Sequence, residues 1–207
     1  MIKIIYFFFI LDYNNNIINE EAKEIITDIN SSIKELSQQI ASPKNPVPAG
    51  GATIATTALL GVSLLKLVFQ VSQNNWNIKT KEEFNEYLTT LNTIQEDLSQ
   101  AIADDTKAYQ INLANNFQNQ TKLKKIIAVP LQITETAKAA LTVGDKLEGK
   151  VKTTVQADHK VATLNLKASI KGAITIIEAN YNFFPADDNY IKKVKSKINK
   201  IKDRDEF

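Results

Sequence analysis

The sequence of 207 residues contains no cysteine, one histidine and one arginine. The absence of cysteine excludes disulfides, thiolate metal ligands and cysteine nucleophiles. His159 alone cannot build a metal site from several imidazoles, and Arg204 lies too near the C-terminus to clamp an anion in the core. The side chains left for chemistry are carboxylates, lysines, amides and hydroxyls, so we expect no metal site.

Glycine and proline are also scarce, with 6 and 5 residues. Such a low content disfavours an all-β sandwich or barrel, because each hairpin needs turn residues. The 25 basic and 23 acidic residues leave a net charge of +2, without the basic excess that a dedicated nucleic-acid-binding protein needs. Hydrophobic residues make up 43% of the chain and charged residues 23%, as in globular proteins. We therefore expect a globular protein with no nucleic-acid partner.

Two segments are apolar enough to raise the question of a membrane. Ile4–Leu11 is too short to cross a bilayer, and the residues after it do not form a signal-peptide cleavage site. Ala52–Val71 has a borderline length, but it contains Lys66 and several threonines. We expect Ala52–Val71 to be a wholly buried central helix and the protein to be cytoplasmic, with no membrane partner. A membrane-associated protein that uses both segments is an alternative hypothesis.

Apolar residues recur at helical spacing through most of the chain. Pro130 falls inside one of the predicted helices and predicts a bend there. We expect an all-α protein: a single-domain helical bundle of long, partly kinked helices at residues 19–207, after an N-terminal extension at residues 1–18. The predicted helices cover Asn19–Ile40, Ala52–Val71, Lys81–Asn115, Lys122–Leu147, Asp158–Ala179 and Ile191–Lys202.

One carboxylate falls on the apolar side of a predicted helix. In Lys81–Asn115, Asp105 lies three residues after Ile102 and four before Tyr109, on the stripe that faces the core. An aspartate that points inward needs a partner or has a raised pKa, which suits a group that gives and takes a proton. Asp105 is therefore the candidate catalytic residue. The structural alternative is a buried cap for a neighbouring helix or for the backbone at Gly50-Gly51.

Four stretches, in chain order, resemble the formiminotetrahydrofolate cyclodeaminase and methenyltetrahydrofolate cyclohydrolase family. Ser42–Ala55 looks like the family's Pro-Thr-Pro-Gly-Gly-Gly-Ser loop, which runs into an apolar helix. Asp105-Thr-Lys-Ala-Tyr109 is similar to the family's Asp-x-x-Ala-Phe/Tyr, and Val129-Pro-Leu131 lies inside a helix. Asp158-His-Lys-Val-Ala162, with the later Gly172-Ala173 and Asn180, is similar to Ser-Asp-x-x-Val-Ala and Gly-Ala…Asn-Val-x-x-Asn. The resemblance runs from about Ile25 to the C-terminus.

The resemblance implies a reaction on a one-carbon unit held between two folate nitrogens. The cyclodeaminase closes formiminotetrahydrofolate with release of ammonia, and the cyclohydrolase hydrolyses methenyltetrahydrofolate; neither reaction needs a metal or another cofactor. It also implies a homodimer and a folate as the small-molecule partner. The implied site has Asp105 as acid and base, and its substrate-binding residues are Pro48, Gly50, Gly51, Tyr109, Asp158 and Asn180.

Several positions depart from the family's pattern. Ala49 and Ala52 stand where the glycine-rich loop has a glycine and a serine, Ala157 replaces the serine before the aspartate, and Ile176 replaces the first late asparagine. The connection between Tyr109 and the next helix is also shorter than usual. These changes leave open the alternative of a non-catalytic helical dimer of the same fold with an eroded folate pocket.

Overall fold

The computed structural model describes residues 32–44, 47–76 and 81–204. Clustering of contacts divides the chain into two units, Met1–Pro43 and Lys44–Phe207. Within the first unit, residues 32–40 form a helix, which confirms the C-terminal part of the helix predicted at Asn19–Ile40. The predictions for residues 1–31, including the extension at 1–18, lie outside the described residues.

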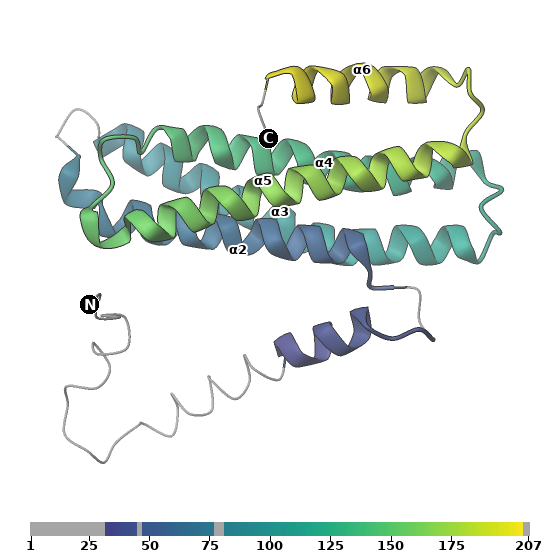
Figure 1. Ribbon diagram of the computed structural model, residues 1–207, viewed down its shortest axis with the longest axis horizontal. Helices are drawn as coiled ribbons and strands as arrows, with labels where there is room; N and C mark the ends of the chain where they lie inside the picture. The colour runs from purple at the N-terminus through teal and green to yellow at the C-terminus, as the bar shows by residue number, and fades with distance from the viewer. Residues whose placement is uncertain (1–31, 45–46, 77–80, 205–207) are drawn as a thin grey trace, which may run out of the picture. The chain divides into compact units, whose positions relative to one another are not determined.

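The second unit is built from four long antiparallel helices (Figure 1). α2 packs against α3 and α5, and α4 packs against the same two helices, so the four surround one core. A fifth helix, α6, lies along α4 and α5 and buries Ile191, Val194, Ile198 and Ile201. The described residues contain no strand, so the predicted all-α fold is confirmed. The bounds are α2 Gly50–Val71, α3 Lys81–Leu113, α4 Gln120–Asp145, α5 Gln156–Asn180 and α6 Asn189–Arg204.

Because successive helices run in opposite directions, five helix ends lie at the same end of the bundle. The first turns of α2, α4 and α6 lie at the same end of the bundle as the last turns of α3 and α5 (Figure 1). We call this end the Gly50 end. Contacts between chain-distant residues agree with it: the Tyr190 hydroxyl in α6 is 3.3 Å from the Lys124 carbonyl oxygen in α4.

Local side-chain caps account for two of these helix starts. Asn119 accepts a hydrogen bond from the backbone N–H of Lys122 at 3.1 Å, so α4 begins two residues earlier than the apolar pattern predicts. Asp188 accepts from the N–H groups of Tyr190 and Ile191 at 2.8 and 3.0 Å and so caps the start of α6. Each cap pairs donors that the first turn of a helix leaves free.

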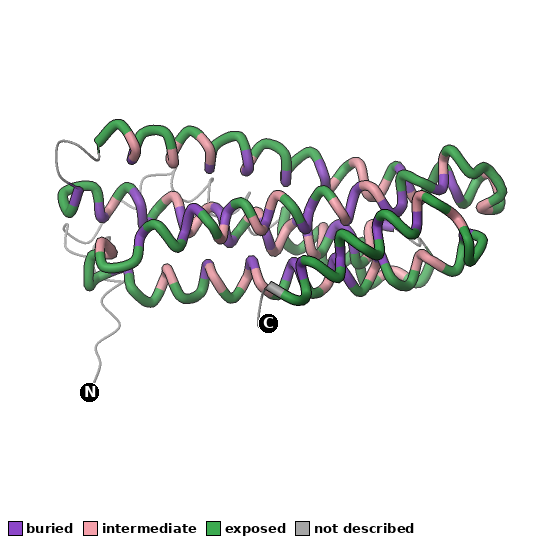
Figure 2. Tube along the Cα trace, turned by 90° about the horizontal axis from the view of Figure 1, so that it is seen from above, coloured by how far each residue is buried: buried purple, intermediate pink, exposed green. Residues whose placement is uncertain are grey.

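α2 is buried on its inner side only, so the prediction of a wholly buried helix is wrong. Buried residues face the inside of the bundle along its helices and exposed residues face outward (Figure 2). On the outer side of α2, Leu60 is 54% exposed and Leu67 is 39% exposed. By length and composition alone, α2 and α4 could each cross a membrane, but the inner side of each forms part of the core.

Candidate active site

Asp105 meets the first turn of α2 at the Gly50 end. A Cβ built on Gly51 would lie 2.0 Å from Asp105 Cγ, so the carboxyl group occupies the space that any other residue would fill. The backbone N–H of Ala52 donates a hydrogen bond to the same carboxylate. Ala49, at the start of α2, offers no side-chain cap. Asp105, a residue of α3, therefore caps the start of α2 in place of a local side chain, as the structural alternative predicts.

Two opposed effects set the protonation of Asp105. Burial raises its pKa above the usual carboxyl value, because a charged group loses solvation away from water. The hydrogen bond from Ala52 favours the ionised form and acts in the other direction, but burial is the larger effect. Asp105 remains only half-buried. The carboxyl group is therefore both within reach of a ligand and closer to the pH range in which a proton shuttle works.

The loop before α2 and a side chain of α5 flank this contact. Pro48 is half-buried and follows the buried Val47 through a cis peptide bond. A Cβ on Gly50 would lie 3.2 Å from Cδ1 of Ile176, so the first turn of α2 packs directly on α5. Ile176 thus places an apolar side chain where the family resemblance implies the amide of an asparagine.

Tyr109 lies one helical turn beyond Asp105 and joins an aromatic cluster. Its ring makes an edge contact with Phe117 at 5.5 Å between centroids. Phe117 in turn stacks on Phe183, with centroids 4.6 Å apart and an interplanar angle of 14°. Neither Phe117 nor Phe183 was predicted from the sequence as a site residue. Only tertiary structure brings the α3–α4 turn beside the residues that follow α5.

Asn180 forms a hydrogen bond with a backbone carbonyl group at the Gly50 end. Its side-chain amide nitrogen donates to the carbonyl oxygen of Ile126 at 2.8 Å. In an uninterrupted helix that carbonyl would accept from the residue four positions later, but that residue is Pro130, which has no N–H. Asn180 therefore supplies the donor that the proline removes and ties α5 to α4. This contact joins two of the four stretches on which the resemblance rests.

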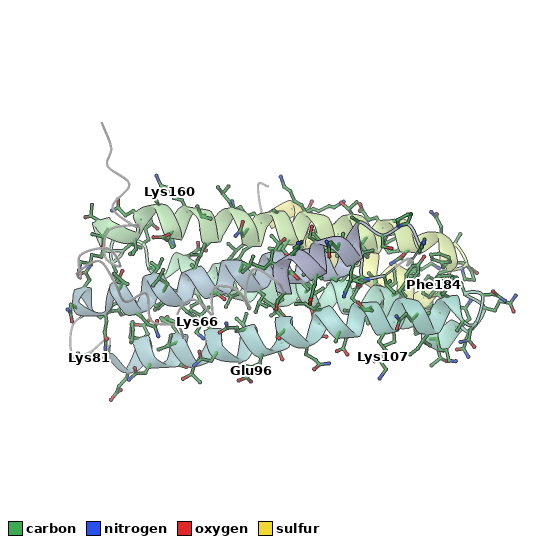
Figure 3. All side chains as sticks on the ribbon, turned by 90° about the horizontal axis from the view of Figure 1, so that it is seen from below. Lys66, Lys81, Glu96, Lys107, Lys160 and Phe184 are labelled. Atoms are coloured by element: carbon green, nitrogen blue, oxygen red, sulfur yellow. The ribbon has the colours of Figure 1, made fainter. Side chains whose placement is uncertain are left out.

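Within one chain, Asp158 does not lie near the other candidate site residues at the Gly50 end. It lies in the first turn of α5, two residues after the helix begins, whereas the N-cap position is held by Val155. The 22 residues between Asp158 and Asn180 correspond to about 33 Å of helix. Lys160, its near neighbour, lies at the end of the bundle opposite Phe184 (Figure 3). His159 is half-buried, and its Nε2 atom lies 3.2 Å from the Gly144 carbonyl oxygen.

Two surface hollows lie beside α3, on other sides from the Asp105 contact. One, of about 380 Å³, lies between α2 and α3 and is lined by Lys66 and Glu96 (Figure 3). Lys66 contacts the side chain of Gln95 there, which explains how a lysine fits into the apolar sequence of α2. The other, of about 290 Å³, lies between α3 and α4 and includes Asp104 and Lys107. Within the described ranges, no three acidic or histidine side chains gather as a metal site would require.

Comparison with known proteins places this architecture in a family. Residues 32–200 match the family model described as formiminotransferase-cyclodeaminase. The chain belongs to the formiminotransferase-cyclodeaminase family. The match covers most of the bundle, including every candidate site residue. Family and fold together point to folate one-carbon metabolism.

A solved structure supports the same fold. The crystal structure of formiminotetrahydrofolate cyclodeaminase from Thermotoga maritima, at 2.80 Å resolution, superposes with a TM-score of 0.74. The sequences are 16% identical, and the match covers 81% of this chain and 86% of that chain. No curated protein matches the sequence. The cyclodeaminase-type bundle is therefore shared, while the chemistry of this chain has to be argued from its own residues.

Proposed function

We propose that the chain acts on a folate one-carbon unit, either closing formiminotetrahydrofolate with release of ammonia or hydrolysing methenyltetrahydrofolate. The observation that carries the proposal is the half-buried Asp105 carboxyl group, held against the first turn of α2 and with its pKa raised by burial. The membership of the chain in the cyclodeaminase family supports the choice of substrate class. The proposed reactions use the folate as substrate and need no further cofactor.

In the proposed cyclodeaminase reaction, Asp105 transfers two protons, one after the other. As N10 of the folate attacks the formimino carbon, a C–N bond forms and the N10 proton passes through the Asp105 carboxylate to the imine nitrogen. A second proton, taken from solvent through Asp105, converts the resulting amino group into ammonia, and the bond between it and the carbon breaks. The product is the methenyl cation. A carboxyl group with a raised pKa suits both steps, because it is a stronger base when ionised and is more often protonated near neutral pH.

The first turn of α2 contributes polarity and orientation. Gly50 is exposed at the positive end of α2, so its backbone N–H group can meet a carbonyl or carboxylate of the substrate, while the buried Gly51 leaves room for the Asp105 carboxyl group. Pro48 shapes the loop that enters this turn, and Tyr109 lies one turn from Asp105. Holding the folate in register with Asp105 accounts for much of the expected rate, because both proposed reactions depend on geometry.

Absorbance at the methenyl-folate band tests the proposal with both substrates. Formation of the band from formiminotetrahydrofolate indicates cyclodeamination, and its loss from methenyltetrahydrofolate, above the spontaneous rate, indicates hydrolysis. Asp105→Asn keeps an oxygen acceptor for the Ala52 N–H, so we expect it to fold and to lose turnover. Full activity of the folded Asp105→Asn protein would contradict the assignment of Asp105.

A second candidate function is folate binding without turnover by a protein of the same fold. Ile176 presents hydrocarbon to Gly50 where the family has an amide, and the Asn180 amide nitrogen already serves the Ile126 carbonyl. These contacts leave fewer polar groups to orient a substrate. Calorimetric binding of tetrahydrofolate, with both substrates unchanged after long incubation, would favour this candidate over the enzyme.

We also propose that the chain forms a homodimer through the outer face of α2 and α5. Leu60 on α2 is 54% exposed, and Val161 and Leu164 on α5 are 46% and 65% exposed. The two helices pack closely, since a Cβ on Gly61 would lie 3.0 Å from Leu166. Lys66 is the only charged residue of α2, and it faces α3 instead. A symmetric dimer would cover the exposed apolar side chains of this face with its own copy, which is the usual arrangement of two-fold interfaces.

Sedimentation velocity measures this association directly. We expect a dimer for the wild-type chain and a monomer for Leu164→Glu, because the substitution places a charge in the middle of an apolar contact. Leu113→Glu is the matched control, since Leu113 is 45% exposed at the end of α3, away from the proposed face. A monomeric wild-type chain at micromolar concentration would contradict the dimer.

A further inference from the structure

Three aromatic side chains gather at the Gly50 end from three parts of the chain. Tyr109 comes from α3, Phe117 from the turn between α3 and α4, and Phe183 from the residues that follow α5. We refer to these three residues as the aromatic cluster. Tyr109 and Phe117 are half-buried, whereas Phe183 is 40% exposed. The cluster therefore has one face in the protein and one ring accessible from outside.

The turn that presents Phe117 has an unusual backbone. Asn116 and Phe117 have φ angles of 49° and 55°, in the left-handed region that favours glycine. Asparagine tolerates this region, but a bulky residue such as phenylalanine occupies it only when its surroundings hold it there. The buried Asn112 does so: its carbonyl accepts from the Phe117 N–H at 2.9 Å, and its side chain donates to the Lys122 carbonyl at 3.0 Å. The chain thus accepts local strain to place an aromatic ring at this point.

The aromatic cluster adjoins the Asp105 contact on two helices. Tyr109 follows Asp105 by four residues on the same side of α3, a rise of about 6 Å. On α5, Ile176 touches the first turn of α2, and Phe183 follows by seven residues. The two helices bring the cluster to the end of the bundle just beyond Asp105. A molecule with its reacting atoms at Asp105 can extend from there onto the ring of Phe183.

We propose that Phe183, held in place by Phe117, stacks on the p-aminobenzoyl ring of the folate substrate. This inference rests on the proposed function. N10, one of the two nitrogens that hold the one-carbon unit, is bonded directly to that ring, so a substrate with N10 at Asp105 has the ring within a few ångströms. The exposed edge of the cluster also leaves the glutamate tail beyond the ring free to reach solvent. Stacked planar rings at such spacing attract each other.

The neighbouring phenylalanines give a matched pair for the test. Phe183→Leu removes the aromatic face but keeps an apolar side chain, and Phe184→Leu makes the same change in a buried ring that packs 6.1 Å from Tyr190 in α6. We expect Phe183→Leu to raise KM for the folate about tenfold with little change in kcat. Phe183→Trp should restore KM. Phe184→Leu should lower the unfolding temperature and leave KM unchanged.

A fragment of the substrate separates ring stacking from a general loss of structure. We expect p-aminobenzoylglutamate to inhibit the wild-type protein competitively, and to inhibit Phe183→Leu about tenfold less well. Wild-type KM and inhibition in a folded Phe183→Leu protein would overturn this inference while leaving the proposed function intact. A wild-type chain that neither binds nor converts either folate would overturn the proposed function, and the inference would fall with it.

Discussion

Replacing Gly51 by alanine tests the central contact of the site without changing Asp105 itself. The added Cβ would lie 2.0 Å from Asp105 Cγ and 2.0 and 2.2 Å from its two oxygens. Ordinary contacts begin at 3.4 Å, so the carboxyl carbon has to retreat by about 1.4 Å. This displacement moves the carboxylate away from the N–H of Ala52 and away from any substrate positioned over the first turn of α2.

The expected loss of activity is larger than the expected loss of stability. A misplacement of about 1 Å in a catalytic group costs on the order of 100-fold in rate. That factor corresponds to about 2.7 kcal/mol of activation free energy. The stability effect is a difference: crowding costs about 1–3 kcal/mol, while alanine is favoured over glycine in a helix by about 1 kcal/mol. We therefore expect Gly51→Ala to fold with a net loss of at most about 2 kcal/mol.

The assay combines kcat from methenyl-folate absorbance with the free energy of unfolding from urea titration. Gly61→Ala is the matched control, because its Cβ would lie 3.0 Å from Leu166 Cγ about 15 Å further along α2. We expect the control to lose stability and keep kcat. Adding Asp105→Ala to Gly51→Ala should recover stability, since the clash disappears, while kcat stays low. Wild-type kcat in Gly51→Ala would refute the reasoning.

Two further predictions concern Asn180 and the titration of Asp105. Asn180→Ala should lower the free energy of unfolding by about 1–3 kcal/mol, because the carbonyl of Ile126 loses its donor. In a Pro130→Ala background, where residue 130 regains its N–H, urea titration should show a clearly smaller loss; equal losses would contradict the pairing. The raised pKa of Asp105 means that the folded chain binds more protons than the unfolded chain above the ordinary carboxyl pKa, so this group lowers stability as pH rises through its folded pKa. Asp105→Asn lacks this effect, and thermal unfolding should show its advantage over wild type growing from about pH 4 to neutrality; a pH-independent difference would contradict the assigned burial.

The helical order and the inward position of Asp105 could be predicted from the sequence because both depend on local spacing. The stripe through Ile102 and Tyr109 fixes the side of α3 on which Asp105 lies, and the structure places that side against α2. The cap at Asp188 is local in the same sense, since it acts within three residues. Features that depend on short-range geometry are the ones most reliably predicted from a single sequence.

The remaining features depend on contacts between distant segments. Nothing local indicates that Asn180 reaches the carbonyl left free by Pro130, or that Phe117 adopts a left-handed backbone to meet Phe183. The position of Asp158 is different, because its distance from Asn180 along one helix was predictable from residue numbers alone. Within one chain, Asp158 and Asn180 therefore lie at opposite ends of α5 and do not share a pocket.

The contact between Asp105 and α2 gives the same carboxyl group two roles, as a helix cap and as a proton-exchanging group. The two roles favour different pKa values. A cap stabilises a helix best when the carboxylate is ionised, and such a cap could have come from a serine or aspartate at Ala49, next to the helix it serves. The chain instead uses a half-buried aspartate from another helix, and burial raises its pKa despite the Ala52 N–H. That arrangement weakens the group as a cap and suits it to exchanging protons. Gly51 is what permits it, because the carboxyl group fits only where the helix carries no side chain.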